Sequence, residues 1–193
     1  IDAVDKLMDG EKADMVFTDP PYGVDYEGGA LTKRNKLAND HSTDIYGDVL
    51  PVLYMATIEK AAFYIWHAAG YADMASRLGD AGFKIRAQLI WNKNMAQFGA
   101  LSAQYKQKHE PCFYCFKEGE APNWYGPTNE VTVWDVKRES KNEFHPTQKP
   151  VALFRYLIRT YTQPGELVLD PCVGSGTTAL AAREEGRNFI CGD

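Results

Sequence analysis

Short apolar runs and amphipathic stretches alternate along the chain. Continuous apolar runs predict strands near residues 14–18, 62–66, 84–92, 111–117, 166–170 and 188–192. Apolar positions at helical spacing predict helices near residues 46–60, 70–81, 148–162 and 176–186. Runs such as AAFYIW and ELVLD are typical of strands that are buried on both faces. The pattern therefore predicts an α/β fold, with a mostly parallel, twisted sheet covered by helices on both faces.

Two long segments, 23–43 and 117–144, interrupt this alternation and are rich in Gly, Pro, Asn and charged residues. Loops of this length are uncommon in compact domains unless they are functional or mobile. Both segments are therefore candidates for a role in function.

Composition favours one globular domain, because 193 residues with 45% hydrophobic and 24% charged residues can bury a sizeable core. No run approaches the roughly 18 apolar residues of a membrane span, and the first residues do not resemble a signal peptide. We therefore expect a soluble, cytoplasmic protein. The net charge of −5 does not favour a surface covered with positive charge. Basic residues nevertheless gather in loop-like segments, at Lys33, Arg34, Lys36, Lys106, Lys108, Lys137, Arg138 and Lys141.

The four cysteines lack the dense spacing of a disulfide scaffold. Cys112 and Cys115 form a C-x-x-C pair, but no second pair completes a zinc site. We interpret them as buried strand cysteines and predict no metal.

The stretch TDPPYG, residues 18–23, ends the first predicted strand with an acid, two prolines and an aromatic ring. Prolines cannot donate to a sheet and fix φ, so the chain stops pairing here in a rigid extended shape. That shape presents the carboxylate of Asp19, the carbonyl of Pro20 and the ring of Tyr22 above the strand end. A simple strand-ending turn with a solvated acid is the alternative.

A second stretch, LVLDPCVGSGTT at residues 167–178, predicts a strand, a glycine turn and the start of a helix. Gly174 and Gly176 permit a close approach to the backbone, and the helix N-terminus supplies free amides. Asp193 ends the next predicted strand and is suited to accept hydrogen bonds from both hydroxyls of a ribose. The turn lacks the full G-x-G-x-x-G spacing because residue 179 is Ala, which favours a nucleoside cofactor over a dinucleotide.

Three motifs in this order, DPPY, HPTQKP at 145–150 and DPCVGSGTT, resemble those of the S-adenosylmethionine-dependent DNA amino-methyltransferases. The order is similar to the β-type permuted arrangement of that family. The resemblance implies a Rossmann-like methyltransferase fold with an antiparallel strand at one side. It also implies that residues 1–193 form a single catalytic domain, truncated at both ends. Cys172 departs from the family, which commonly has Phe there.

The motifs with their resemblance, and the basic residues of the loop-like segments, predict roles for three groups of residues. The catalytic group is Asp19, Pro20, Pro21 and Tyr22. The cofactor-binding group is Asp170, Pro171, Cys172, Gly174, Ser175, Gly176, Thr177 and Asp193, with Gln148 and Lys149 near the methionine end of the cofactor. The nucleic-acid-binding group is Lys33, Arg34, Lys36, Lys137, Arg138 and Lys141, and residues 117–144 form a candidate target-recognition insertion.

The chemistry agrees with these roles. An exocyclic base amine is a poor nucleophile because its lone pair is delocalised into the ring. The Asp19 carboxylate and the Pro20 carbonyl can each accept one amine N–H and hold the lone pair towards the methyl donor. Tyr22 can stack on the base, which has to be flipped out of the duplex. The resemblance implies N6 of adenine as the target, because the motif begins with Asp19, where the cytosine enzymes of the family more often have Ser.

Several alternatives stay open at this point. They are an N4-cytosine DNA methyltransferase, a protein or RNA methyltransferase, and a catalytically silent DNA-binding module. His145 can line the site or simply precede a helix, and Trp124 and Tyr125 can contact DNA or pack onto their own domain. His67 and His109 are interpreted as satisfied strand-end histidines. Expected partners are double-stranded DNA, a second copy of the chain and a cognate restriction endonuclease, in a bacterium or a phage.

Overall fold

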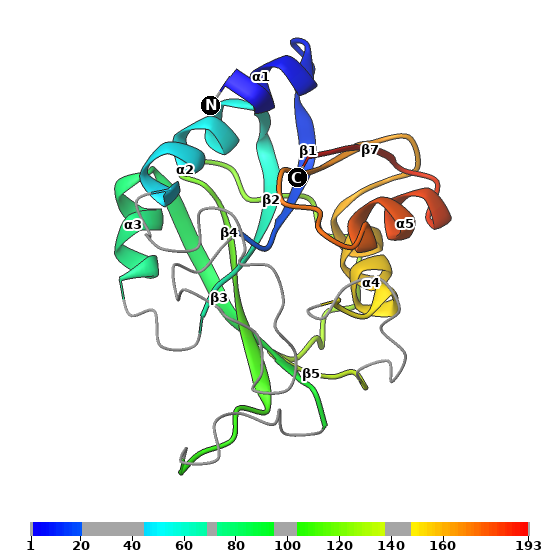
Figure 1. Cartoon of the computed structure of the whole chain (residues 1–193). Coiled ribbons are helices and arrows are strands. Elements are labelled where there is room, and N and C mark those ends of the chain that lie inside the picture. The colour runs from blue at the N-terminus through cyan, green and yellow to red at the C-terminus, as the bar shows by residue number, and fades with distance from the viewer. Residues whose placement is uncertain (1, 21–44, 69–72, 95–103, 138–147, 193) are drawn as a thin grey trace, which may run out of the picture.

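Seven strands of the described residues form one sheet at the centre of the computed structural model (Figure 1). The structure describes residues 2–20, 45–68, 73–94, 104–137 and 148–192. The strands are β1 (Ala13–Thr18), β2 (Thr57–Trp66), β3 (Phe83–Asn92), β4 (His109–Lys117), β5 (Val133–Asp135), β6 (Leu167–Asp170) and β7 (Asn188–Cys191). Their order across the sheet is β5-β3-β4-β2-β1-β6-β7.

The sheet is mostly parallel. β1 pairs in parallel with β2 and β6, β6 with β7, and β3 with β5. β4 pairs antiparallel with both β2 and β3. The predicted fold class is therefore confirmed, but the antiparallel strand lies between two neighbours instead of bordering the sheet. The carboxyl ends of the parallel strands consequently meet at one edge, which we name the carboxyl edge.

Helices cover both faces of the sheet (Figure 1). On one face lie α1 (Asp2–Met8), α2 (Ile45–Met55) and α3 (Met74–Asp80), and on the other lie α4 (Val151–Tyr161) and α5 (Thr177–Glu184). Val16 of β1 packs in the first core and its neighbour Phe17 in the second, as expected for successive residues of a strand buried on both faces. No helix within the described ranges is long and apolar enough to cross a membrane.

The helix predicted at 46–60 is wrong over its last turn. α2 ends at Met55, and β2 begins at Thr57, whose backbone pairs with Ala13 of β1. The Thr57 hydroxyl donates to the carbonyl of Leu53 at 3.1 Å and so closes the helix end. Sheet pairing with β1 outweighs the local helical pattern here.

The other predicted elements agree to within a few residues. The helices predicted at 70–81, 148–162 and 176–186 are α3, α4 and α5, and each is shorter than predicted. The short elements α1 and β5 were not predicted.

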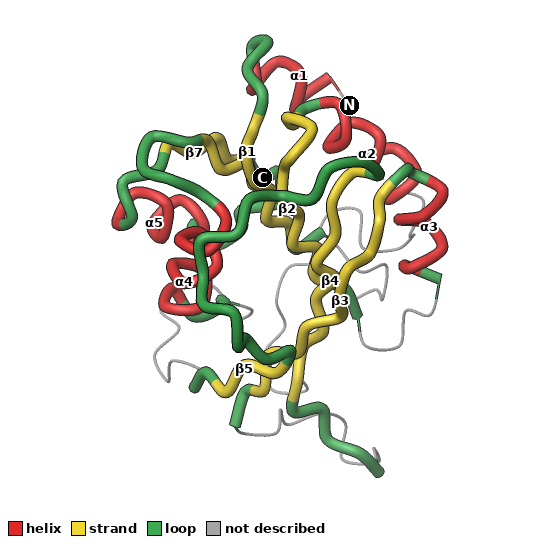
Figure 2. The backbone as a smooth tube through the Cα atoms, turned by 180° about the vertical axis from the view of Figure 1, so that it is seen from behind, coloured by secondary structure: helices red, strands yellow, loops and turns green. Residues whose placement is uncertain are grey.

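Residues 118–132 connect β4 to β5 by crossing the sheet face that carries α4 (Figure 2). The amide of Tyr125 donates to the carbonyl of Thr160 at 2.8 Å, and the rings of Trp124 and Tyr161 lie 4.9 Å apart. The indole of Trp124 donates to the carbonyl of Pro127 at 2.9 Å. Of the two alternatives for Trp124, packing onto its own domain is the one observed.

Candidate active site

Asp19 leaves the sheet at the carboxyl edge, directly after β1. Because β1 lies between β2 and β6, Asp19 and Pro20 stand near the middle of this edge. The Asp19 side chain is 29% exposed, and its Oδ2 accepts a hydrogen bond from Nζ of Lys149. Pro21 and Tyr22 lie outside the described residues.

Lys149 is buried, with only 4% of its side chain exposed. Its ammonium contacts Asp19, lies 3.3 Å from Oε2 of Glu110 and sits 4.7 Å from the centre of the Trp66 ring. Burial by itself lowers the pKa of Lys149, but the carboxylates of Asp19 and Glu110 outweigh it and raise the pKa above its ordinary value. Lys149 is therefore a fixed positive charge beside the candidate catalytic acid.

Glu110, in β4, has a second lysine partner. Its Oε1 pairs with Nζ of Lys93, which follows β3 and is also only 4% exposed. Burial raises the pKa of Glu110, whereas Lys149 and Lys93 lower it, and the net shift is downwards. Glu110 thus joins the two buried lysines at the carboxyl edge.

The predicted cofactor turn begins at Asp170, the last residue of β6. Asp170 is buried and accepts hydrogen bonds from the Cys172 amide at 3.0 Å and from the Thr178 hydroxyl. Burial is the main reason why the pKa of Asp170 is raised, to about 7, with a further rise from Asp19 against the lowering effect of the hydrogen bonds and of Lys149. The pKa of Asp170 therefore depends on the charge of Asp19.

The backbone of this turn is open to a ligand. Gly174 and Gly176 adopt positive φ angles of 48° and 77°, and nothing lies within 4 Å of a Cβ built on either residue. The N-cap residue of α5 is Gly176, which has no side chain to bond the first amides of the helix. Pro171, Cys172 and Ser175 are partly exposed in the same turn. An open glycine backbone, a helix N-terminus and a buried acid fit the nucleoside and carboxylate groups of S-adenosylmethionine.

The end of β7 is held against this turn. The Gly192 amide donates to the Asp170 carbonyl at 2.9 Å, and the Val173 amide donates to the Gly192 carbonyl at 2.8 Å. A Cβ at Gly192 would lie 3.2 Å from Cδ1 of the exposed Leu7 side chain. Asp193 follows directly but lies outside the described residues.

Lys149 joins the two halves of the site. Its side chain pairs with Asp19, and its carbonyl accepts a hydrogen bond from the Thr177 hydroxyl at 3.4 Å. Thr177 begins α5 and also contacts the Ser175 hydroxyl at 3.0 Å. Acceptors for an amine and an open turn for a nucleoside cofactor therefore share one edge, which is an arrangement for transferring a group from the cofactor.

Residues 13–193 match the family model described as DNA methylase. The chain belongs to the DNA methylase family. YubD of Escherichia coli K12 is 30% identical over 184 residues, which cover 94% of this chain and 76% of that protein. The DNA adenine methyltransferase YhdJ of the same organism is 25% identical over 217 residues, covering 96% and 73%.

Two solved structures share the fold. The complex of M1.HpyAVI with S-adenosylmethionine has a TM-score of 0.74 and 25% identity, and covers 100% of this chain and 88% of that one. The PvuII cytosine-N4-specific DNA methyltransferase has a TM-score of 0.73 at 17% identity, and covers 97% and 79%. The resemblance inferred from the three motifs is therefore confirmed, and the protein is a DNA methyltransferase.

Sequence reasoning missed three residues of this methylase site, namely Glu110, Lys93 and Trp66. Glu110 stands in a strand directly before an apolar run, which is the one signal that its side chain could face the core. Burial of its two lysine partners carries no sequence signal, because lysines are typical of exposed positions.

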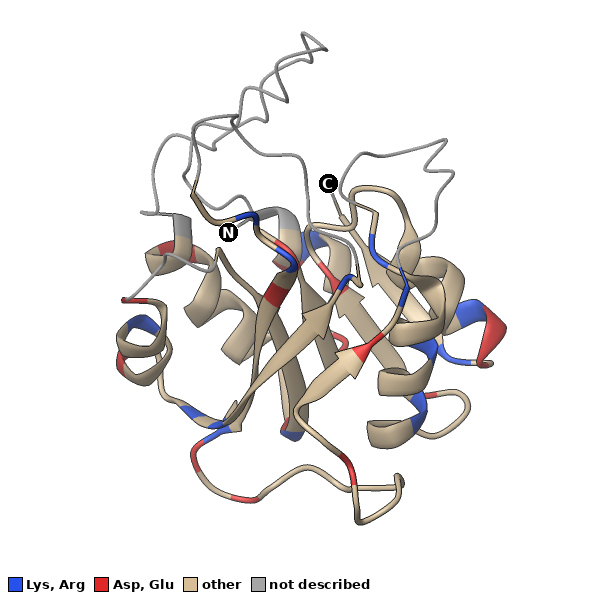
Figure 3. Ribbon diagram, turned by 90° about the horizontal axis from the view of Figure 1, so that it is seen from below, with Lys and Arg blue, Asp and Glu red and all other residues tan. Residues whose placement is uncertain are grey.

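Few of the residues predicted to bind nucleic acid are described. Lys137 follows β5, whereas Lys33, Arg34, Lys36, Arg138 and Lys141 lie outside the described residues, as does His145. Gln148 is partly exposed, directly before Lys149. Seen from the end of the molecule in Figure 3, basic and acidic segments lie close together at the centre of the view.

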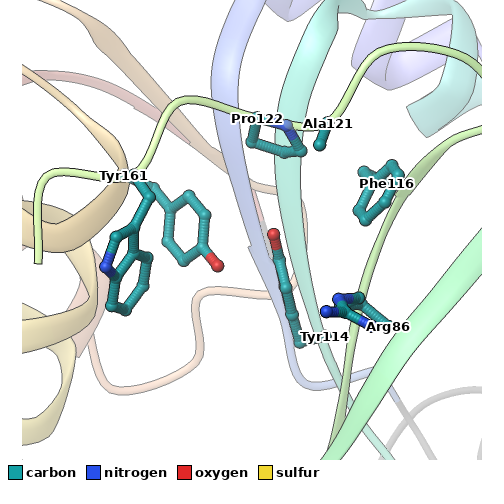
Figure 4. Close-up of a pocket in the computed structure, with 7 residues that line it drawn as sticks. Arg86, Tyr114, Phe116, Ala121, Pro122 and Tyr161 are labelled. Atoms are coloured by element: carbon teal, nitrogen blue, oxygen red, sulfur yellow. The ribbon is translucent and has the colours of Figure 1, made fainter. Parts of the chain in front are cut away.

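A separate pocket lies on the face that carries α4 (Figure 4). Tyr114, Tyr161 and Arg86 point into it in Figure 4, and Ala121, Pro122 and Trp124 also line it. None of the residues predicted for catalysis or cofactor binding lines this pocket, whereas Ala121, Pro122 and Trp124 belong to the predicted recognition insertion.

The remaining candidates, apart from His109, pack in the protein interior. Cys112 and Cys115 belong to different core clusters on opposite faces of the sheet, so they do not face a common ligand. His67 is buried, stacks on Phe113 at 4.5 Å and contacts the Ala68 carbonyl through Nδ1 at 3.0 Å. Its Nε2 has no hydrogen-bond partner among the described residues, so the histidine is only partly satisfied. His109 is exposed.

Proposed function

We propose that this DNA methyltransferase transfers a methyl group from S-adenosylmethionine to the N6 amine of adenine in double-stranded DNA. The observation that supports this most directly is the joining of Asp19 to the open turn at 170–176 through Lys149. A base amine held at Asp19 and a nucleoside held at the turn would then meet at one edge of the sheet.

Asp19 and Pro20 prepare the amine for attack. The Asp19 carboxylate and the Pro20 carbonyl each accept one N–H, which turns the nitrogen lone pair out of the plane of the base. Tyr22 stacks on the flipped base and helps to offset the cost of unstacking it from the duplex. S-adenosylmethionine, when bound, supplies an electrophilic methyl group on a positively charged sulfur.

The turn residues would hold the cofactor through the backbone and the α5 terminus. Asp170 keeps this turn in shape through its bonds to Cys172 and Thr178. Asp193 is proposed to accept the ribose hydroxyls. The Lys149 ammonium already contacts two carboxylates, so Lys149 contributes to the cofactor side through its backbone contact with Thr177.

Adenine is the favoured base because the motif begins with Asp19. The similarity to the adenine methyltransferase YhdJ supports the same choice. N4 of cytosine is the second candidate, because the cytosine-N4-specific PvuII enzyme shares the fold. The fold therefore does not distinguish the two bases.

Mass analysis of nucleosides decides between the two amines. DNA incubated with the protein and S-adenosylmethionine should contain N6-methyladenine and no N4-methylcytosine. N4-methylcytosine as the only product would overturn the adenine assignment, and no methylated base with a folded protein would overturn the activity.

Target recognition is assigned to residues 117–144, with phosphate contacts from Lys137, Arg138 and Lys141. Support comes from β5, which returns the chain to the carboxyl end of β3 and so brings Lys137 to the catalytic side of the sheet. The segment 23–43, with Lys33, Arg34 and Lys36, is proposed to close over the flipped base. A homodimer and a cognate endonuclease stay predictions.

Exchange of this segment tests the recognition assignment. Residues 117–144 of a relative with another specificity, grafted into this chain, should change the methylated sequence. An unchanged site preference in a folded graft would place recognition elsewhere.

A further inference from the structure

Four buried or half-buried charges form a continuous chain at the carboxyl edge. Lys93 pairs with Glu110, Glu110 with Lys149, and Lys149 with Asp19. The exposed fractions of these side chains, in that order, are 4%, 18%, 4% and 29%. The four residues come from three different strand ends and from the start of α4, so tertiary folding brings them together.

Such a chain is costly to bury. Each ion loses its hydration, and an apolar cluster of the same volume is often at least as stable. The two positive and two negative charges compensate one another, so removal of any one of them leaves a buried net charge that destabilises the fold. The neighbouring residues Cys112 and Trp66 are fully buried and show that an apolar solution is available at this place. A costly polar set beside a catalytic acid suggests a role in the reaction.

The order of the four charges shows what that role is. Asp19 has to present carboxylate lone pairs to a base amine, and Lys149 competes for the same lone pairs. Glu110 offers the Lys149 ammonium a second carboxylate at 3.3 Å, and the Trp66 ring holds it 4.7 Å from the ring centre. Lys93 in turn fixes Glu110.

We infer that Glu110 is a positioning residue for methyl transfer, which shares the Lys149 ammonium with Asp19 and so keeps Asp19 in place and able to accept the target amine. This inference rests on the proposed function, in which Asp19 binds that amine. Lys149 already contacts Oδ2 of Asp19, and Glu110 shares its charge from 3.3 Å. Without the Glu110 charge, the contact between Lys149 and Asp19 strengthens, and the Asp19 carboxylate becomes a weaker acceptor for the amine.

The inference concerns the rate of transfer and not the affinity for the cofactor. Glu110 touches Lys93 and Lys149 but none of the residues 170–177 among its described contacts. Loss of its charge should therefore lower the single-turnover rate at saturating DNA and leave the binding of S-adenosylmethionine unchanged.

The first variant is Glu110→Gln, which keeps the shape and removes the charge. We expect a single-turnover rate about 10- to 100-fold lower, less than the loss of a direct transition-state contact, and a cofactor affinity within about twofold by calorimetry. Glu110→Asp, which keeps the carboxylate, should recover most of the rate. Glu59→Gln is the matched control, because Glu59 pairs with the buried Lys117 at 3.6 Å and is itself 82% exposed. It should leave the rate within about twofold.

A second variant covers the case in which Glu110→Gln does not fold. The double variant Glu110→Gln with Lys93→Met restores neutrality of the buried set and should fold. It should still be slow if Glu110 positions Lys149. A rate within twofold of the parent, in either folded variant, overturns the inference.

Asp19→Ala separates this result from the proposed function. If Asp19→Ala is inactive while Glu110→Gln is fast, Asp19 acts without Glu110 and only the inference fails. If Asp19→Ala itself keeps the parent rate, the proposed function fails.

Discussion

Two lysines of this methylase, Lys149 and Lys117, are buried to the same extent at opposite edges of the sheet. Each side chain is 4% exposed, and each ammonium lies 4.7 Å from the centre of an aromatic ring, that of Trp66 for Lys149 and that of Tyr54 for Lys117. Lys149 has two carboxylate partners, both less than one third exposed. Lys117 has the exposed Glu59 at 3.6 Å and the carbonyl of Thr57 at 2.8 Å.

The pKa values of the two lysines move in opposite directions. Burial lowers both, and for Lys117 the pull of Glu59 does not compensate, so its pKa falls. For Lys149 the two carboxylates outweigh burial, so its pKa rises. Equal burial therefore has unequal consequences, because a nearby, poorly hydrated acid stabilises an ammonium far more than an exposed one. The lysine with the better partners is the one beside Asp19, the proposed catalytic acid.

Removing each ammonium in turn is the most direct way to break this comparison. Lys149→Met removes the cation that Asp19 and Glu110 share, leaves Glu110 with Lys93 alone in the set, and should lower the free energy of unfolding by about 3–5 kcal/mol. Lys117→Met leaves the solvated Glu59 and the Thr57 carbonyl without this ammonium and should lower the free energy of unfolding by only about 1–2 kcal/mol. Urea denaturation at pH 7 measures both. Equal losses would mean that burial, and not the partners, governs the two sites.

Asp19, which faces Lys149, and Glu59, which faces Lys117, should also differ in their effect on the rate of methyl transfer. Asp19→Ala should lower the single-turnover rate about 100- to 1,000-fold, the typical loss for one preorganised contact to the reacting group, with cofactor binding intact. Glu59→Ala, with its acid at the far edge, should leave the rate unchanged. A near-normal rate for folded Asp19→Ala would reduce Asp19 to a residue that shapes the turn.

Asp193 is the acid proposed to bind the cofactor, whereas Asp19 is the acid proposed to bind the base. Asp193→Ala should weaken the binding of S-adenosylmethionine by about 1–3 kcal/mol, because charge-assisted hydrogen bonds to the ribose are lost. Titration calorimetry should show weaker binding of S-adenosylmethionine to Asp193→Ala and unchanged binding to Asp19→Ala. Unchanged affinity would remove Asp193 from the ribose site.

The smallest expected effect concerns Asp170, an acid without a lysine in direct contact among its described hydrogen bonds. Its pKa is raised to about 7, so the folded protein holds a proton that the unfolded chain releases at about pH 4. Folding stability attributable to Asp170 therefore falls as the pH rises through this window, and levels off above about pH 7.

Asp170→Asn should remove this fall of folding stability with rising pH. Between pH 6 and pH 7 the parent should lose about 1 kcal/mol of stability relative to the variant. Urea denaturation of both proteins at pH 6, 7 and 8 measures the difference. A constant difference across the three pH values would mean that Asp170 is ionised throughout.

Local patterns determined much of the methylase from its sequence. The apolar run before Asp19 forms β1, and the run before Asp170 forms β6, because a strand buried on both faces needs continuous apolar residues. The glycines at 174 and 176 form the turn because positive φ angles suit glycine. Prolines, glycines and a strand end are local features, so the positions of the acceptor and of the open turn along the chain could be read directly.

Tertiary structure alone decided how these parts meet. Residues 57–60 follow a helical pattern but belong to β2, whose first residue, Thr57, pairs with Ala13 of β1, so tertiary pairing outweighs local propensity here. Lys149 reaches Asp19 across 130 positions of sequence, and Glu110 and Lys93 join them from β4 and from the end of β3. Lysine and glutamate are typical surface residues, so only the surrounding fold can make their burial tolerable, by bringing opposite charges together as they lose water.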